Sequence, residues 1–261
     1  MKRLLILLVL LLCCLGAARA EEAPRFGALT GVDALREALE NGARVETAHY
    51  TDGYGFSTSE FKTGDPRVIA ALIEALGQIE IVEQVNEDVT DWYPQIVFTL
   101  SDGSRPGARF DAHWLEVDGR THYLLSGDEA FWTLTARLTA AAQNPVARVE
   151  YLRGGSRSSV IVSAWREADA CRLLYNDVEY TADAAVLDDA GCLLAMYGVQ
   201  AWNGFSGSDP RVLDGESFRL EITFADGSVI AANGSNRFPP DYRAVMDALG
   251  ELFSGAVQSG E

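Results

Sequence analysis

The chain has 261 residues, of which 48% are hydrophobic, and its 38 acidic and 21 basic residues give a net charge of −17. This acidic balance excludes nucleic-acid binding as a function, because proteins that bind phosphate backbones need a basic surface. The hydrophobic content is sufficient for a packed core, and the length allows one large domain or two of ordinary size.

The N-terminus has the three parts of a secretory signal peptide. Lys2 and Arg3 precede an apolar run over residues 4–15, and an Ala-x-Ala cleavage site ends at Ala20. The apolar run is shorter than the roughly 20 residues that a membrane-spanning helix needs. We therefore expect removal of residues 1–20, which makes the rest secreted or extracytoplasmic without a transmembrane segment.

Two alternatives to cleavage stay open. The leader could remain as an uncleaved anchor, or a lipid could be attached to Cys13 or Cys14. Lipid attachment normally follows a small residue, and Leu12 does not fit that pattern. Lipid anchoring is therefore not the expected outcome.

Strand and helix patterns alternate in the first half. Asp65 and Pro66 are typical of a helix start, and Gly77 ends a run of apolar residues at helical spacing: Ile69, Leu72, Ile73 and Leu76. A second helix, over 32–41, opens with a variant capping box of Thr30 and Asp33. Strands are expected at 44–49, 95–100, 109–117 and 121–125, with two-residue turns at Asp102-Gly103 and Asp118-Gly119.

A third helix closes the first half and leads to the second. Ser126 and Glu129 form a capping box for a helix that carries Phe131, Leu134 and Leu138. In the second half we expect strands at 146–152, 159–164, 171–175, 218–224 and 229–232, with the turn Asp226-Gly227. Helices are expected over 183–197 and after Pro239-Pro240, where Tyr242, Met246, Leu249 and Phe253 form an apolar stripe.

Two segments of the first half recur in the second. Residues 98–104 match residues 222–228 in register, and residues 43–46 recur as 147–150. The fold class is therefore predicted as α+β, with two tandem, duplicated units at 21–143 and 144–261. Each unit would be an antiparallel sheet with helices packed on one face. Alternatively, turn chemistry alone makes two unrelated hairpins look alike.

Three segments of the second half form a distinctive pattern: Trp202-Asn203-Gly204-Phe205, residues 213–218 (Leu-Asp-Gly-Glu-Ser-Phe) and residues 233–239 (Asn-Gly-Ser-Asn-Arg-Phe-Pro). With this pattern, residues 146–254 resemble the C-terminal region of uncharacterised exported proteins and lipoproteins of Gram-positive, often gut, bacteria. The resemblance implies a bacterial cell-envelope or secreted setting and no catalytic activity. The missing lipobox departs from the lipoproteins of that group.

Residues for nucleophilic catalysis are scarce. The three histidines, His49, His113 and His122, lie in the first half, and no Gly-x-Ser-x-Gly elbow is present. Beyond the leader the chain has two cysteines, Cys171 and Cys192. Export permits a disulfide between them, but Cys192 falls on the expected polar side of its helix, so the disulfide stays open. We predict a non-enzymatic protein without a cofactor.

Two sets of residues are candidate metal ligands. Asp209, Asp214 and Glu216 lie in one loop, and oxygen-rich loops can bind calcium; the alternative is a long turn without a ligand. A two-residue turn at residues 118–119 would set His122 opposite Leu115, on one sheet face with His113 and Asp111. Such a face could hold zinc, but strand histidines without a ligand are the favoured interpretation.

Aromatic residues give a third candidate site. Trp202, Asn203 and Phe205 are candidate ligand-binding residues, and the five tryptophans could stack sugars: Trp92, Trp114, Trp132, Trp165 and Trp202. Aromatic residues at strand and helix positions belong more often to a core. The leading prediction is thus an exported, non-catalytic protein with a protein-interaction surface. A module that binds calcium or glycan is the alternative, and a hydrolase is third.

Overall fold

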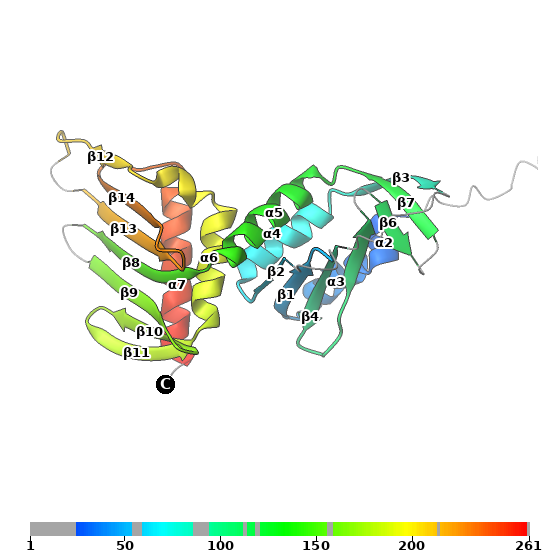
Figure 1. The fold of residues 1–261 in the computed structure, drawn as a ribbon, viewed down its shortest axis with the longest axis horizontal. Helices are drawn as coiled ribbons and strands as arrows, with labels where there is room; N and C mark the ends of the chain where they lie inside the picture. Colours follow the sequence, from blue (N-terminus) through cyan, green and yellow to red (C-terminus); the bar gives the residue numbers. More distant parts are fainter. Residues whose placement is uncertain are drawn as a thin grey trace, which may run out of the picture.

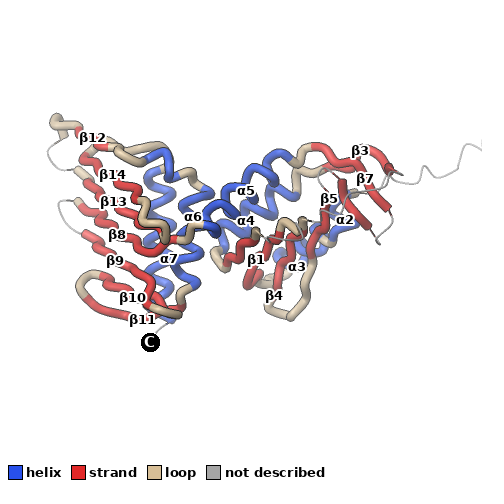
Figure 2. The backbone as a smooth tube through the Cα atoms, viewed as in Figure 1, coloured by secondary structure: helices blue, strands red, loops and turns tan. Residues whose placement is uncertain are grey.

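The structure, a computed structural model, describes residues 25–53, 59–85, 94–111, 114–117, 121–155, 159–212 and 215–259. The predicted signal peptide at residues 1–20 lies outside the described residues. Two seven-stranded sheets, each with its own helices, make the chain an α+β protein, which confirms the predicted class (Figure 1). Figure 2 shows the strands and helices of the two parts as separate groups that meet at α5 and α6.

The first sheet has the strand order β2-β1-β4-β5-β6-β7-β3. Its strands are β1 (Val45–Thr51), β2 (Glu60–Thr63), β3 (Glu80–Val85), β4 (Gln95–Leu100), β5 (Gly107–Asp111), β6 (Trp114–Val117) and β7 (Thr121–Ser126). Its helices are α2 (Phe26–Thr30), α3 (Val32–Glu40), α4 (Pro66–Leu76) and α5 (Glu129–Gln143). The buried residues of these helices and of one sheet face form one core, so the helices cover one face.

The second sheet has the strand order β11-β10-β9-β8-β13-β14-β12. Its strands are β8 (Val146–Gly154), β9 (Ser159–Glu167), β10 (Ala170–Tyr175), β11 (Val178–Asp183), β12 (Ser206–Ser208), β13 (Ser217–Phe224) and β14 (Val229–Ser235). The helical elements are α6 (Ala185–Met196), the 3₁₀ helix η1 (Val199–Trp202) and α7 (Tyr242–Ser259). All neighbouring strands are antiparallel except β12 and β14, which run parallel.

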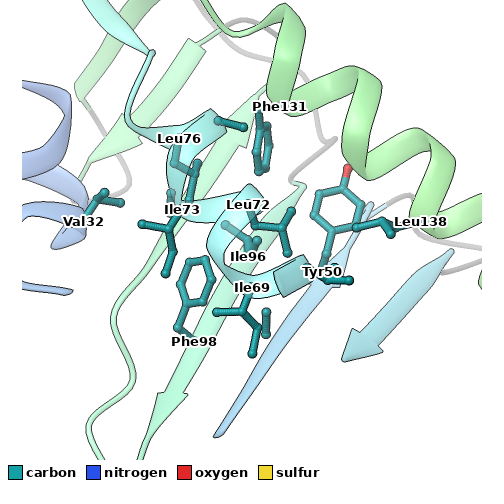
Figure 3. Packing of buried hydrophobic residues seen from close by; sticks show 14 of the residues in the cluster. Val32, Tyr50, Ile69, Leu72, Ile73, Leu76, Ile96, Phe98, Phe131 and Leu138 are labelled. Carbon is teal, nitrogen blue, oxygen red and sulfur yellow. The ribbon is translucent and has the colours of Figure 1, made fainter. Parts of the chain in front are cut away.

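Helix α4 shows why the apolar spacing predicted its structure correctly. The Asp65 side chain accepts hydrogen bonds from the backbone N–H groups of Arg67 and Val68, and Pro66 occupies the first turn. The stripe Ile69, Leu72, Ile73 and Leu76 is buried, and Figure 3 shows it against Phe98 of β4 and Phe131 of α5.

The two sheets share a local arrangement. Loops 101–103 and 225–227 each contain three residues, and the hydrogen bonds from Leu100 N to Ser104 O and from Phe224 N to Ser228 O close them. Each loop is therefore one residue longer than the two-residue turn that was predicted, at Asp102-Gly103 and at Asp226-Gly227. Gly103 and Gly227 have φ angles of 83° and 84°, in the left-handed region that glycine favours.

The strands that flank these loops also correspond. Ala48 of β1 lies opposite Phe98, and Val149 of β8 lies opposite Ile222, with a bulge close to the loop in both pairs of strands. The predicted match of residues 43–46 with 147–150 would instead have aligned Val45 with Val149. The shared arrangement is consistent with two units, and duplication stays a prediction.

Further local predictions are wrong. The single strand predicted over 109–117 is two strands, β5 and β6, which pair antiparallel with Phe110 opposite Leu115. Helix α3 is capped by Gly31 without a side-chain hydrogen bond, so the predicted Thr30 and Asp33 box is not formed.

In β6 and β7, Val117 lies opposite Thr121 and His122 opposite Glu116, so the loop is longer than the predicted turn and His122 does not face Leu115. His113 lies outside the described residues. Helix α5 begins after Asp128 rather than with a Ser126 cap, and the Asp128 carboxylate accepts a hydrogen bond of 2.6 Å from Trp132 Nε1.

Helix α6 belongs to both cores. Leu187, Ala190 and Leu194 pack in the second core, whereas Cys192 and Leu193 pack in the first. A helix that is apolar all round is typical of a buried position, and α6 lies between α5 and the second sheet (Figure 1). Among the described helices, none has the length and apolar character to cross a membrane.

Candidate functional site

The predicted aromatic site lies at the surface of the second core. Trp202 is 3% exposed, and its ring centroid lies 6.3 Å from that of Phe218 and 6.5 Å from that of Tyr242. Phe205 packs 6.4 Å from Phe218, while Asn203 is exposed and accepts a hydrogen bond of 3.2 Å from Ala231 N. Since Trp202 is buried, its ring offers no open face for stacking a sugar.

The predicted calcium ligands have protein partners. Asp209 binds the guanidinium of Arg211 at 2.8 and 2.9 Å. Glu216 Oε1 accepts hydrogen bonds from Arg153 Nε at 2.6 Å and from the Tyr242 hydroxyl at 2.8 Å. Asp214 lies outside the described residues. Within the described part of the chain, no group of three His, Cys, Asp or Glu side chains is arranged to hold a metal ion.

Cys171 and Cys192 are both buried and free, so they form no disulfide in this structure. The expectation that Cys192 lies on a polar helix side is wrong, because α6 is buried on that side by the first unit. Burial raises the pKa of the Cys171 thiol to about 11, and burial together with nearby carboxylates raises that of Cys192 to about 12. Neither thiol is therefore a nucleophile at neutral pH.

The second sheet has a face that points away from α6 and α7, which we call the outer face. Val162 and Ala164 of β9 are buried, so alternation places the half-buried Trp165 on the opposite side. Trp165 lies directly between Arg172 of β10 and Arg148 of β8. Residues 161–165 (Ile-Val-Ser-Ala-Trp) do not alternate between apolar and polar types, so the strand pairing and not a sequence signal singles out Trp165 among the five tryptophans.

Charged and aliphatic side chains surround Trp165 on the outer face. Arginines form ion pairs with acidic residues on the same side of the sheet: Arg148 with Glu150, Arg172 with Glu179, and Arg219 with Glu221. Ile161, which is 40% exposed, lies opposite Leu152. An amphipathic tryptophan thus lies among ion pairs and beside an exposed aliphatic pair.

Polar contacts join the two units where β2 meets α6. The Thr63 hydroxyl and the Gly64 N–H group donate hydrogen bonds of 2.7 and 2.8 Å to Asp189 Oδ1. Burial raises the pKa of the Asp189 carboxyl, although these two hydrogen bonds oppose the shift.

A second contact joins α4 to α7. The Arg67 guanidinium binds the fully buried Asp65 carboxylate at 2.6 Å and reaches Glu251 of α7 at 2.7 Å. Since Asp65 also caps α4, the start of that helix is fixed against the second unit.

Two clefts lie at the junction of the two units. The acidic cleft, about 730 Å³, contains Asp183, Asp189 and Glu251 beside Arg44 and Arg67. The junction cleft, about 650 Å³, is lined by side chains and backbone from both units: His49, Glu60, Phe61, Lys62, Ala141, Ala142, Pro145, Val146, Arg166, Asp188, Gly191 and Cys192. Clefts between domains are common places for ligands.

Comparison with known proteins gives no relative: no protein-family model, no curated protein and no solved structure matches this chain.

Proposed function

We propose that the chain is an exported, non-catalytic protein that binds another protein at the bacterial cell envelope or outside the cell through the outer face of its second sheet. The observation that carries this proposal is Trp165, half-buried on an open sheet face between Arg148 and Arg172. Tryptophan and arginine are the residues most enriched in the energetic centres of protein interfaces.

The chemistry of the outer face favours a protein over the alternative ligands. A sugar-binding platform would need a row of exposed aromatic rings, and Trp165 is the single aromatic residue among the described outward-pointing strand positions of the second sheet. Calcium would need unpaired carboxylates, whereas Glu150, Glu179 and Glu221 are paired with arginines. Paired charges around one amphipathic ring suit a polar protein surface with complementary hydrogen bonds.

The test compares binding of two tryptophan variants to intact cells of the source organism. Trp165→Ala removes the outer-face ring, and Trp114→Ala is the matched control, because Trp114 points away from the core on the first sheet next to the buried Leu115. The purified chain from residue 21 onward is labelled with a fluorophore, and saturable binding is measured by flow cytometry. We expect Trp165→Ala to weaken binding about 30-fold or more, equivalent to the roughly 2 kcal/mol of an interface hot spot.

Enzymatic treatment of the cells identifies the class of partner. Protease treatment should abolish binding, whereas digestion of cell-wall glycans should leave it intact. Binding that survives protease and is lost with the glycans would contradict a protein partner. Equal binding by the two variants would show that the outer face is not the contact surface.

A further inference from the structure

Strand β11 is an open edge of the second sheet. Among the described strands, β10 alone pairs with it, and β11 stands at the end of the strand order. In an antiparallel strand, each residue directs its N–H and C=O groups to the same neighbouring strand, and successive residues alternate between the two sides. Every second residue of β11 therefore has two backbone groups that no described strand satisfies.

The turn between β10 and β11 shows which residues these are. Asn176 and Asp177, with φ angles of 48° and 66°, form a two-residue turn, so the flanking Tyr175 and Val178 exchange both backbone hydrogen bonds. The hydrogen bond of 2.9 Å from Asn176 N to Ile161 O agrees, because it directs Asn176 toward β9 and its neighbour Tyr175 toward β11. Alternation along β11 then leaves three residues with backbone groups that point away from the sheet: Glu179, Thr181 and Asp183.

The acidic cleft lies along this edge. Thr181, Ala182 and Asp183 are consecutive residues of β11 and all line the cleft, although their side chains alternate between the two faces of the sheet. The cleft therefore opens along the edge of the strand rather than on one face. Its other lining residues belong to α6, to α7 and to the first unit.

The cleft carries more negative than positive charge. Four carboxylates and two guanidinium groups line it: Asp65, Asp183, Asp189 and Glu251, and Arg44 and Arg67. Arg67 is already bound to both Asp65 and Glu251. The balance stays negative even where Asp189 is protonated. A positively charged side chain is therefore favoured in the cleft over a negatively charged one.

The cleft also has apolar lining, and its charge disfavours a second copy of the chain. Val186 and Leu252 are half-buried lining residues, which suit apolar side chains of a ligand. Two copies of β11 paired antiparallel about Thr181 would place Glu179 of each copy opposite Asp183 of the other. Like charges directly opposite each other destabilise a pair of strands.

We propose that β11 binds an extended basic segment of a partner protein, which adds a strand to the second sheet. Backbone hydrogen bonds to the open edge would hold the segment, and its alternating basic and apolar side chains would match the carboxylates and the apolar lining of the acidic cleft. This surface is the edge of the sheet, whereas the function proposed above depends on Trp165 of the outer face. Either contact can therefore exist without the other.

The probe is the fluorescein-labelled peptide Thr-Val-Lys-Val-Lys-Val-Thr, whose binding to the folded chain is measured by fluorescence anisotropy. We expect saturable binding that weakens as the salt concentration rises, because salt screens the charges of both partners. The same peptide with glutamate in place of both lysines should bind about tenfold more weakly or worse. No saturable binding of the lysine peptide, or equal binding of the two peptides, would overturn the proposal.

Two substitutions at one position test the backbone contact. Thr181→Pro removes an N–H group that points away from β10, and proline is tolerated at such edge positions. It should weaken binding about tenfold or more, because a peptide carbonyl would lose its donor. Thr181→Val is the matched control: it also removes the hydroxyl that accepts a hydrogen bond from Arg172, but it keeps the N–H group and should bind as wild type does. Wild-type affinity in Thr181→Pro, or equal loss in both variants, would contradict an added strand.

Amide hydrogen exchange followed by NMR tests the edge in the unmodified chain. The lysine peptide should slow exchange at Glu179 and Thr181. Exchange at Val178 and Tyr180 should stay unchanged, because their N–H groups already bond to β10. Slowing that does not alternate along β11, or no slowing at this strand, would place the peptide elsewhere.

Asp183→Asn tests the charge, because the amide oxygen can still accept the hydrogen bond from Ala185 N. This variant should bind the lysine peptide about twofold to fivefold more weakly. Glu129→Gln, at an exposed position of α5 outside the cleft, should bind it as wild type does. Equal affinities in the two variants would exclude Asp183 as a contact of the basic side chains.

Sedimentation of the chain without peptide tests the second copy as the occupant of the edge. We expect the same monomeric mass for wild type, Thr181→Pro and Thr181→Val. A dimer that Thr181→Pro alone disrupts would assign the edge to a second copy and overturn the proposal of a basic partner segment.

Discussion

Asp189 is a partly buried carboxylate at the junction, and its ionisation opposes folding. Burial raises its pKa above the usual value, so the folded chain binds this proton more tightly than the unfolded chain. This contribution to stability is complete below the unfolded pKa of about 4 and is lost as pH rises through the folded pKa.

Asp189→Asn should remove this pH-dependent loss of stability, because asparagine does not ionise. Its amide oxygen can still accept the hydrogen bonds from Thr63 and Gly64. The free energy of unfolding of the variant, relative to wild type, should therefore increase as pH rises from about 4 toward neutral. Urea unfolding at a series of pH values measures this difference. A difference that is constant with pH, or one that decreases as pH rises, would contradict the assignment.

Leu72 tests the packing of the first core. Its side chain is fully buried on α4, among the residues in Figure 3. Leu72→Ala should lower the free energy of unfolding by about 2–5 kcal/mol, because a cavity remains after the side chain is truncated. Glu74→Ala is the control on the exposed side of the same helix and should change stability by less than about 0.5 kcal/mol. Equal losses of stability in the two variants would mean that the side of α4 that carries Leu72 does not face the core.

Sequence patterns correctly predicted the environment of some residues and not of others, and the difference has a physical cause. Helix α4 is apolar on one side, so the spacing of its apolar residues shows which side is buried. Cys192 lies on a helix that two cores bury from opposite sides, and a single chain segment contains no sign of the second core. Trp165 required the strand partners Arg148 and Arg172, which come from different parts of the chain.

At the scale of elements, the two hairpin loops form a matched pair. Gly103 and Gly227 both have positive φ, and a Cβ added at either position would meet no atom within 4 Å apart from its chain neighbours. Any cost of adding a methyl group therefore comes from the backbone conformation. Gly103→Ala and Gly227→Ala should each destabilise by about 1–2 kcal/mol.

The control for these loops is Gly255 of α7, which is helical and exposed, and where an added Cβ would have the same open space around it. Gly255→Ala should stabilise the chain by about 0.5–1 kcal/mol, because alanine loses less conformational entropy in a helix. Thermal unfolding of the three variants measures all of these effects. Clearly unequal losses at Gly103 and Gly227 would weaken the idea that the loops are equivalent parts of two related units.

The helices and strands that the sequence patterns did not predict are short or lie at the edges of the sheets. Strands β2, β3 and β11 are edge strands of their sheets, and α2 has five residues. The burial pattern of β3 is mostly exposed, so its sequence lacks the alternation that indicates a strand. The hairpin strands β4 and β13 were found because they alternate and end at an Asp-Gly pair.

For the whole molecule, α6 decides whether the halves unfold together. The predicted boundary between residues 143 and 144 falls between α5 and β8, but Leu193 of α6 is fully buried in the first core. Unfolding of the second unit would remove this side chain from the first core. We therefore expect both sheets to unfold in one cooperative transition.

Hydrogen-exchange pulse labelling across a urea series measures this in the unmodified chain. Peptides from β4 and β13 should lose protection at the same urea concentration. Leu193→Ala should lower both midpoints together, at a cost of about 2–5 kcal/mol, although the residue belongs to the second half of the sequence. If only the β13 peptides responded, or if the wild-type midpoints were separate, the two halves would be independent domains.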